Sequence, residues 1–166
     1  MKNESYEIEA RGVGDVGEAV VLVGRAMNAA EGRWAERTFG YHFACAEHGI
    51  DDGRSYFVWR RGRRIAGLVG LHHYLWGPEG NVWLAWFAVE PDLQRQGHGS
   101  ALLKSIEAIA REAGYRKLLV ETYAHSDFDS ARQFYASQGF AEAGRIAEYL
   151  DDGSDMIVYG KELRAH

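Results

Sequence analysis

The chain has 166 residues, 46% of them hydrophobic and 26% charged, which is typical of one globular domain with a real core. Its formal net charge of −5 argues against nucleic acid as the main partner, because phosphate backbones bind basic surfaces. The single cysteine excludes an internal disulfide framework, and no apolar run is long enough to span a bilayer. The N-terminus lacks the apolar segment of a signal peptide, so we expect a cytoplasmic protein with no membrane partner.

The first part of the chain alternates between strand and helix patterns. Residues 5–11 alternate apolar and polar side chains and predict a strand. Residues 13–48 have helical periodicity and predict two short helices, the second weakened by Gly40. Residues 55–77 form two β-rich runs around Arg61-Gly62-Arg63, which predicts a hairpin.

The rest of the chain is predicted to hold two helices and four strands. These elements are a central apolar strand over 81–89, a helix over 99–114, a strand over 115–123, a helix over 126–139 and a hairpin over 140–163. Ser126 or Asp127 is the expected N-cap of the second helix, and Gly114 and Gly139 are the expected helix ends. Asp152-Gly153 is the expected hairpin turn. The order βααβββαβαββ predicts a single α/β domain over residues 1–166.

The segment VEPDLQRQGHGSALL, residues 89–103, places two glycines before an apolar helix. Such loops hold phosphates at helix N-termini. A Walker loop is excluded because Ser100 follows Gly99 where a lysine is required. A dinucleotide fingerprint fails as well, because Leu102 occupies the third glycine position. A helix start that binds nothing remains the alternative.

Two motifs together are more specific than the glycines alone. The loop Gln94-Arg95-Gln96-Gly97-His98-Gly99 matches the pattern Q/R-x-x-G-x-G/A, and ARQFYASQGF, residues 131–140, matches A-x-x-F/L-Y-x-x-x-G-F. Over residues 81–163 the chain resembles the GCN5-related N-acetyltransferase (GNAT) superfamily. This resemblance implies the GNAT fold, a mixed central sheet of about seven strands flanked by about four helices. It also implies acetyl-CoA as the cosubstrate.

The resemblance assigns the cofactor contacts. The backbone N–H groups of the glycine loop would face the pyrophosphate of coenzyme A, and the pantetheine arm would pair with the strand that ends at Val89. Many relatives carry asparagine where this chain has Phe128, which we expect to pack against the arm. The expected cofactor-binding residues are Phe87, Ala88, Val89, Gln94, Arg95, Gln96, Gly97, His98, Gly99, Ser100, Phe128 and Ala131. No metal is expected, because the histidines lack metal-ligand spacing.

Direct attack of an amine on the thioester requires an acid and a base. The resemblance places the general acid at Tyr135, which could protonate the leaving thiolate; the alternative is a buried structural tyrosine. Glu121, inside a strand, is the first candidate for the base, and a solvated or ion-paired carboxylate is its alternative. His72 and His73 are further candidates, and because they are adjacent on a strand they point to opposite faces.

The acceptor is expected to be an amine of a small molecule or a peptide. In the resembling fold its site is built from the first two helices and the late strands, and the segment of the first two helices brings aromatic and acidic residues here. These are Trp34, Phe39, Tyr41 and Phe43, with Glu36, Glu47, Asp51 and Asp52. The alternative is a helix pair that only packs on the sheet, with its acids in solvent. A non-catalytic acyl-CoA sensor and an interaction domain on the same fold are alternative functions, and homodimerisation stays open.

Overall fold

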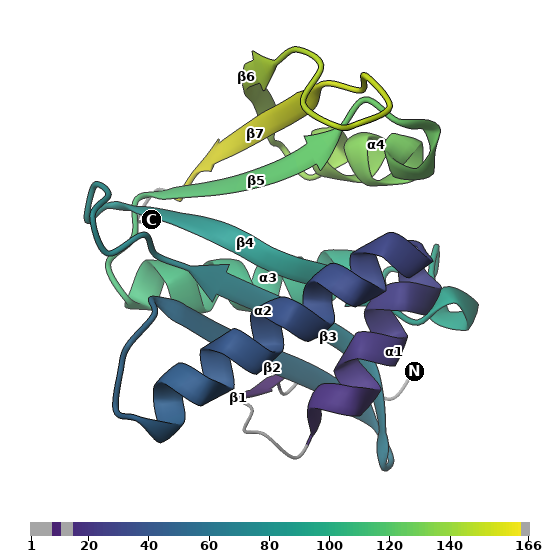
Figure 1. Cartoon of the computed structure of the whole chain (residues 1–166). Coiled ribbons are helices and arrows are strands. Elements are labelled where there is room, and N and C mark those ends of the chain that lie inside the picture. Colours follow the sequence, from purple (N-terminus) through teal and green to yellow (C-terminus); the bar gives the residue numbers. More distant parts are fainter. Residues whose placement is uncertain (1–7, 11–14, 164–166) are drawn as a thin grey trace.

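The computed structural model describes residues 8–10 and 15–163 (Figure 1). The strands are β1 (Ile8–Ala10), β2 (Arg54–Arg61), β3 (Arg64–His72), β4 (Asn81–Val89), β5 (Lys117–Tyr123), β6 (Ala141–Ile146) and β7 (Met156–Glu162). The helices are α1 (Val16–Ala26), α2 (Ala29–Glu47), α3 (His98–Glu112) and α4 (Asp129–Ser137), with 3-10 turns η2 (Pro91–Leu93) and η3 (Ser126–Phe128). The predicted α/β fold and its order βααβββαβαββ are confirmed.

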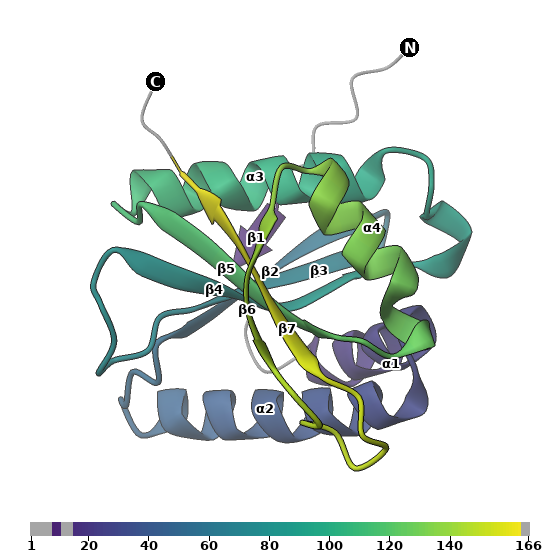
Figure 2. The ribbon, with the colours of Figure 1, turned by 90° about the horizontal axis from the view of Figure 1, so that it is seen from above.

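The seven strands form one mixed sheet in the order β1-β2-β3-β4-β5-β7-β6. Only β4 and β5 pair in parallel, and every other neighbouring pair is antiparallel. Seen from above, α1 and α2 cover one face of the sheet, and α3 and α4 lie on the other (Figure 2). Each face has its own cluster of buried apolar side chains. None of the helices in the described part of the chain is long and apolar enough to cross a membrane.

Several local predictions need correction. The first predicted strand is seen only as Ile8–Ala10, and its other residues lie outside the described part. The second helix is not short: α2 runs for 19 residues through Gly40, which lies on an exposed side where a missing side chain leaves no gap. Ser126 and Asp127 do not cap α4, because they form the turn η3, whose own cap is the His125 side chain. Residue Phe128 then directly precedes α4.

The last hairpin also differs from its prediction. Its strands are joined by residues 147–155 rather than by a two-residue turn. Asp152-Gly153 lies at the tip of this loop, where the Gly153 N–H donates to the Leu150 carbonyl over 2.9 Å. Asp152 accepts from the Ser154 N–H over 2.8 Å, an Asx turn that stabilises the tip. The predicted turn residues therefore lie at the tip of the connection, but the connection itself is longer than predicted.

The sheet opens between β4 and β5. These strands pair only from Asn81 to Trp83, opposite Lys117 to Leu119, and then diverge (Figure 1). β4 also has a bulge, because the β3 register passes from Phe87 to Ala85 and skips Trp86. Trp86 has φ 53°, a left-handed conformation that is rare for a bulky residue. The divergence and the bulge together interrupt the middle of the sheet. Beyond Trp83 the edge of β4 that faces β5 is unpaired, whereas its other edge still pairs with β3.

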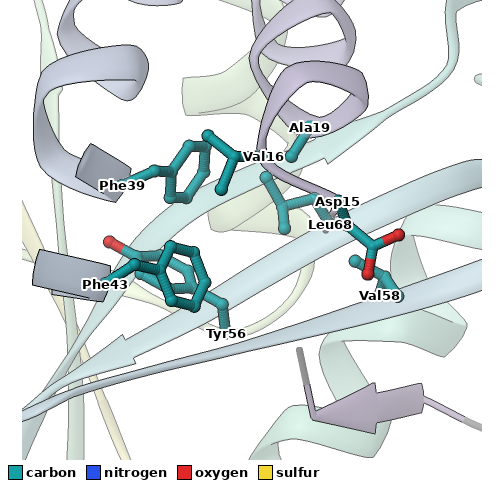
Figure 3. A pocket seen from close by; sticks show the side chains of 8 residues that line it. All are labelled: Asp15, Val16, Ala19, Phe39, Phe43, Tyr56, Val58 and Leu68. Carbon is teal, nitrogen blue, oxygen red and sulfur yellow. The ribbon is translucent and has the colours of Figure 1, made fainter. Parts of the chain in front are cut away.

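A small cavity lies beneath α1, between the helices and β2–β3 (Figure 3). Its walls include Val16, Phe39 and Phe43, with the Asp15 carboxylate at one end. It measures about 10 Å³, which is about the space of one water molecule. A packing defect of this size cannot hold a substrate, so the functional site lies elsewhere.

Candidate active site

A cleft of about 510 Å³ opens where β4 and β5 diverge. It cuts through the sheet, so that residues from both helical layers line it. Its walls are Met27, Glu31, Trp34, Thr38, Arg54, Tyr56, His72, Tyr74, Trp83, Leu84, Ala85, Trp86, Phe87, Val120, Glu121, Thr122, Tyr123, Phe128, Ala131, Tyr135, Tyr149 and Leu150. This volume is that of a small-molecule site, and the mixture of aromatic walls with a few polar groups is typical of one.

One side of the cleft is built by α4 and the end of β4. The Phe87 ring stacks on Phe134 with centroids 5.6 Å apart, and Tyr135 lies beside them. A Cβ on Gly99 would sit 3.5 Å from the Phe134 ring, so the start of α3 packs against the same aromatic group. The predicted glycine loop and the predicted general acid therefore lie next to one another.

Within the glycine loop, side chains hold the backbone in place. Gln94 donates to the Val89 carbonyl over 3.0 Å, and Gln96 donates to the Asp92 carbonyl over 2.8 Å. Arg95 and Gly97 both have positive φ, 60° and 87°. For Gly97 this backbone conformation, not the space around a Cβ, explains why glycine is required.

The loop leads into a helix start whose N–H groups are available. His98, the first residue of α3, stacks its ring on Trp59 at 4.8 Å and is buried. Its side chain therefore packs in the core, and only its backbone belongs to the loop surface. The first N–H groups of a helix have no intrahelical acceptors, and an anion placed there also meets the positive end of the helix dipole.

The other predicted cofactor residues differ in whether their side chains reach the cleft. Phe87, Phe128 and Ala131 line the cleft, whereas the side chains of Ala88 and Val89 are buried and those residues pair with β3. The Phe128 ring packs edge-on against Tyr123, with centroids 5.2 Å apart. Phe128 is thus a wall residue at the start of α4.

Tyr135 is buried among other rings but reaches the cleft wall. Its neighbours are Phe87, Phe134, Phe140 and Tyr159, with centroids between 5.5 and 6.5 Å away. Burial raises the pKa of the Tyr135 phenol above its ordinary value of 10.0. The phenol therefore stays protonated throughout the neutral range and could donate a proton.

Two carboxylates enter the cleft from opposite elements. Glu121 projects from β5, and Glu31 comes from the first turn of α2, where Asn28 caps the helix by accepting from the Glu31 N–H. Glu121 is open to solvent through the cleft, yet the surrounding walls remove enough water to raise its pKa above 4.5. The pKa of Glu31 is raised by burial and then by the negative charge of Glu121, which shows that the two groups lie within electrostatic reach.

The structure separates the two candidate histidines. His72 lines the cleft, and burial, followed by the charge of Arg54, lowers its pKa from 6.5 to about 4. His73 points away, packs near the Tyr115 ring at 5.7 Å and lies 3.3 Å from the Asn81 carbonyl through Nδ1. Only His72 could therefore contact a molecule in the cleft.

The predicted acceptor residues are mostly elsewhere. Of the four aromatic residues named from the sequence, only Trp34 lines the cleft, whereas Phe39 and Phe43 are buried in the core beneath α2, and Tyr41 is exposed. None of the four predicted acids is among the lining residues, and Asp52 instead binds His42 and Arg54 at 2.8 and 2.9 Å. For Phe39 and Phe43 the structure therefore favours the alternative, a helix that packs on the sheet, because residues on several faces of one helix cannot all reach one cleft.

Several residues of the cleft could not be assigned to it from the sequence alone. Glu31 follows the cap Asn28 at the spacing of a helix start, a pattern that explains an acid without invoking function. Tyr149 lies in the loop of the last hairpin and reaches the cleft only through the fold, where it stacks on Tyr123 at 6.2 Å. Thr122 lies in a largely apolar strand, so nothing in its local sequence indicated a site residue. The alternation of β5 could have indicated it, because Thr122 and Glu121 point to opposite faces of the sheet.

The comparisons with known proteins agree with this geometry. Residues 23–140 match the model of the Acetyltransferase (GNAT) family, which covers more than half of the chain. The chain therefore belongs to the GNAT acetyltransferase family, whose fold supports acetyl transfer.

Solved structures share the fold over nearly the whole chain. A protein described as a GNAT-family acetyltransferase from Desulfovibrio desulfuricans is 24% identical, with a TM-score of 0.83 over 95% of this chain and 99% of that one. The ribosomal-protein-S18-alanine N-acetyltransferase from Escherichia coli is 25% identical, with a TM-score of 0.75 over 96% and 95%. A GNAT-family acetyltransferase from Elizabethkingia anophelis, solved with acetyl-CoA bound, is 19% identical, with a TM-score of 0.73 over 96% and 99%. Among curated proteins, none matches the sequence.

Proposed function

We propose that the protein is an acetyl-CoA-dependent N-acetyltransferase that moves an acetyl group to a primary amine by direct attack. The observation that carries this proposal is the placement of Tyr135 and Glu121 on the walls of one cleft, beside the glycine loop. The related structure with acetyl-CoA bound supports this choice of donor. The start of α3, with Gly97 and Gly99, would bind the pyrophosphate, and the free edge of β4 would pair with the pantetheine arm.

The reaction assigns one role to each titratable group. The amine nitrogen attacks the thioester carbonyl carbon, and a backbone N–H near Val89 stabilises the oxyanion. The carbon–sulfur bond then breaks, and the coenzyme A thiolate takes the phenol proton of Tyr135. The amine loses its proton to Glu121, either directly or through water.

Glu121 is a better base than His72 in this cleft. A group with a pKa of about 4 holds a proton only weakly, so His72 is a poor acceptor at neutral pH. Burial instead raises the pKa of Glu121 above 4.5, which makes its carboxylate a stronger base than an ordinary glutamate. We therefore assign His72 to the cleft wall and Glu121 to proton removal.

The direct test measures free thiol released from acetyl-CoA with a panel of primary amines. Binding is tested separately by thermal melting, because a ligand at 100 times its Kd adds about 2.7 kcal/mol of stability. We expect stabilisation by coenzyme A and acetyl-CoA, lost in Gly97→Val, where φ 87° disfavours a branched side chain. Absence of any stabilisation in the parent protein would exclude the proposal. Stabilisation without turnover of any amine would instead support the alternative, a non-catalytic acyl-CoA sensor.

A further inference from the structure

Glu31 and Glu121 have no partners in the cleft. Neither side chain has an ion pair or a hydrogen bond with any residue of the described ranges. The fully buried acids are paired: Glu90 binds Arg25 and Arg64 at 2.7 Å each, and Glu107 binds Lys161 at 2.6 Å. The helix start accounts for an acid at Glu31, but neither carboxylate has a counter-charge in the cleft, which leaves both available to a cationic ligand.

The cleft has no free positive charge to balance the two acids. Among its lining residues Arg54 is the only permanent cation, and it binds Asp52 at 2.9 Å. His72 is neutral at pH 7 because its pKa is lowered to about 4. The described walls of the cleft therefore carry two uncompensated negative charges, and the charge of Glu121 acts on Glu31.

The rest of the cleft matches a cation with an alkyl chain. Trp34, Tyr74, Tyr123 and Tyr149 supply aromatic faces, which attract ammonium groups and pack against methylenes. The Tyr56 ring, whose side chain is only 3% exposed, adds to the aromatic wall of the cleft.

We propose that the acceptor is an alkylamine with a second positive charge, whose reacting amine lies at Glu121 and whose other ammonium binds Glu31. Glu31 is then a specificity-determining residue. The same charges disfavour acceptors that carry a carboxylate, such as free amino acids, because the carboxylate would meet two like charges. This inference rests on the proposed acetyltransferase activity and narrows its substrate class.

The test uses three amines that differ in one group each. Cadaverine has two ammonium groups, pentylamine lacks the second, and lysine adds a carboxylate to cadaverine. We expect kcat/KM for cadaverine to exceed that for pentylamine and for lysine by about tenfold or more, as a charged contact in a partly shielded site provides. In Glu31→Gln the ratio of cadaverine to pentylamine should fall toward one. Glu36→Gln, an exposed acid on the same helix outside the cleft, should leave the ratio as it is.

The outcomes separate this inference from the proposed function. Equal kcat/KM for cadaverine and pentylamine in the parent protein would overturn the dication inference and leave the acetyltransferase standing. Retention of the cadaverine preference in a folded Glu31→Gln protein would overturn the role of Glu31. Failure of every amine to react, with acetyl-CoA bound, would overturn the acetyltransferase itself. The preference of the parent protein can be measured whether or not the variant folds.

Discussion

Gly70 on β3 lies directly against the backbone of Ala85 on β4. A Cβ on Gly70 would be 2.2 Å from the Ala85 carbonyl oxygen and 2.7 Å from the Tyr56 ring. The next residue of β4, Trp86, forms the bulge, and the Trp86 indole N–H donates to the Thr38 hydroxyl over 2.7 Å. The missing side chain at Gly70 thus lets β3 approach β4 where β4 bends into the cleft.

Gly70→Ala should therefore destabilise the protein severely. The new Cβ meets backbone, which cannot rotate away, so β4 must shift and the free energy of unfolding should fall by about 3 kcal/mol. Chemical denaturation measures this loss. The control is Gly144→Ala on β6, where a Cβ meets nothing within 4 Å. Equal stability of the two variants would show that the approach of β3 to β4 is not tight.

Thr122→Val should weaken donor binding without harming the fold. The Thr122 side chain is 3% exposed and lines the cleft, and its Oγ1 has no partner among the described residues. It shares a face of β5 with Val120, which packs in the same core as Tyr135, so we expect it to bind the acyl donor.

Valine has the shape of threonine and removes the unpaired hydroxyl, so stability should rise by about 1 kcal/mol. The KM for acetyl-CoA should rise several-fold, and Thr122→Ser should keep the parent value. A loss of stability in Thr122→Val with an unchanged KM would mean that the hydroxyl serves the fold.

Tyr135→Phe should lower kcat with little effect on acetyl-CoA affinity. Loss of a positioned general acid costs about 100-fold or more in rate, whereas the ring and its packing are kept. Single-turnover rates and the melting shift with acetyl-CoA separate chemistry from binding. Tyr159→Phe is the matched control, because the Tyr159 ring has its centroid 6.5 Å from that of Tyr135 and does not line the cleft. Equal rates for both variants would remove Tyr135 from the chemistry.

The sequence predicted the fold better than the acceptor side of the site. Residues 81–89 and 117–123 have period-two or continuous apolar patterns, and local rules suffice for such elements. The glycine loop and Tyr135 belong to contiguous motifs, so their neighbourhood could also be predicted. Glu31 and Tyr149 are far apart in the chain and meet Glu121 only because the sheet opens between β4 and β5. No local pattern encodes where two strands part.

The wrong prediction of the α4 N-cap also has a physical reason. Ser126 and Asp127 are good N-cap residues by type, yet the His125 side chain accepts from the Asp127 N–H at 3.1 Å and begins a 3-10 turn first. Arg132 then donates to the His125 carbonyl over 3.0 Å and ties the turn to α4. The choice between neighbouring caps is therefore made by local side-chain contacts, which the cap preference of each residue type alone does not contain.

Neutralising Glu31 should stabilise the ligand-free protein at neutral pH but not at acid pH. Its folded-state pKa is raised above 4.5 by burial and by Glu121, so the folded state binds a proton more tightly than the unfolded state. The resulting stability is fully present below pH 4.5 and is lost as the pH rises through the folded pKa. Above that range the ionised Glu31 therefore lowers the free energy of unfolding. The melting temperature of Glu31→Gln should exceed that of the parent at about pH 7.5 and approach it at about pH 4. Glu36→Gln, at an exposed position outside the cleft, should not raise the melting temperature at neutral pH. A diamine that binds the cleft should narrow the difference in melting temperature between Glu31→Gln and the parent at neutral pH. A Glu31→Gln protein that melts below the parent at neutral pH would mean that this carboxylate is paired in the folded protein, contrary to the electrostatics described above.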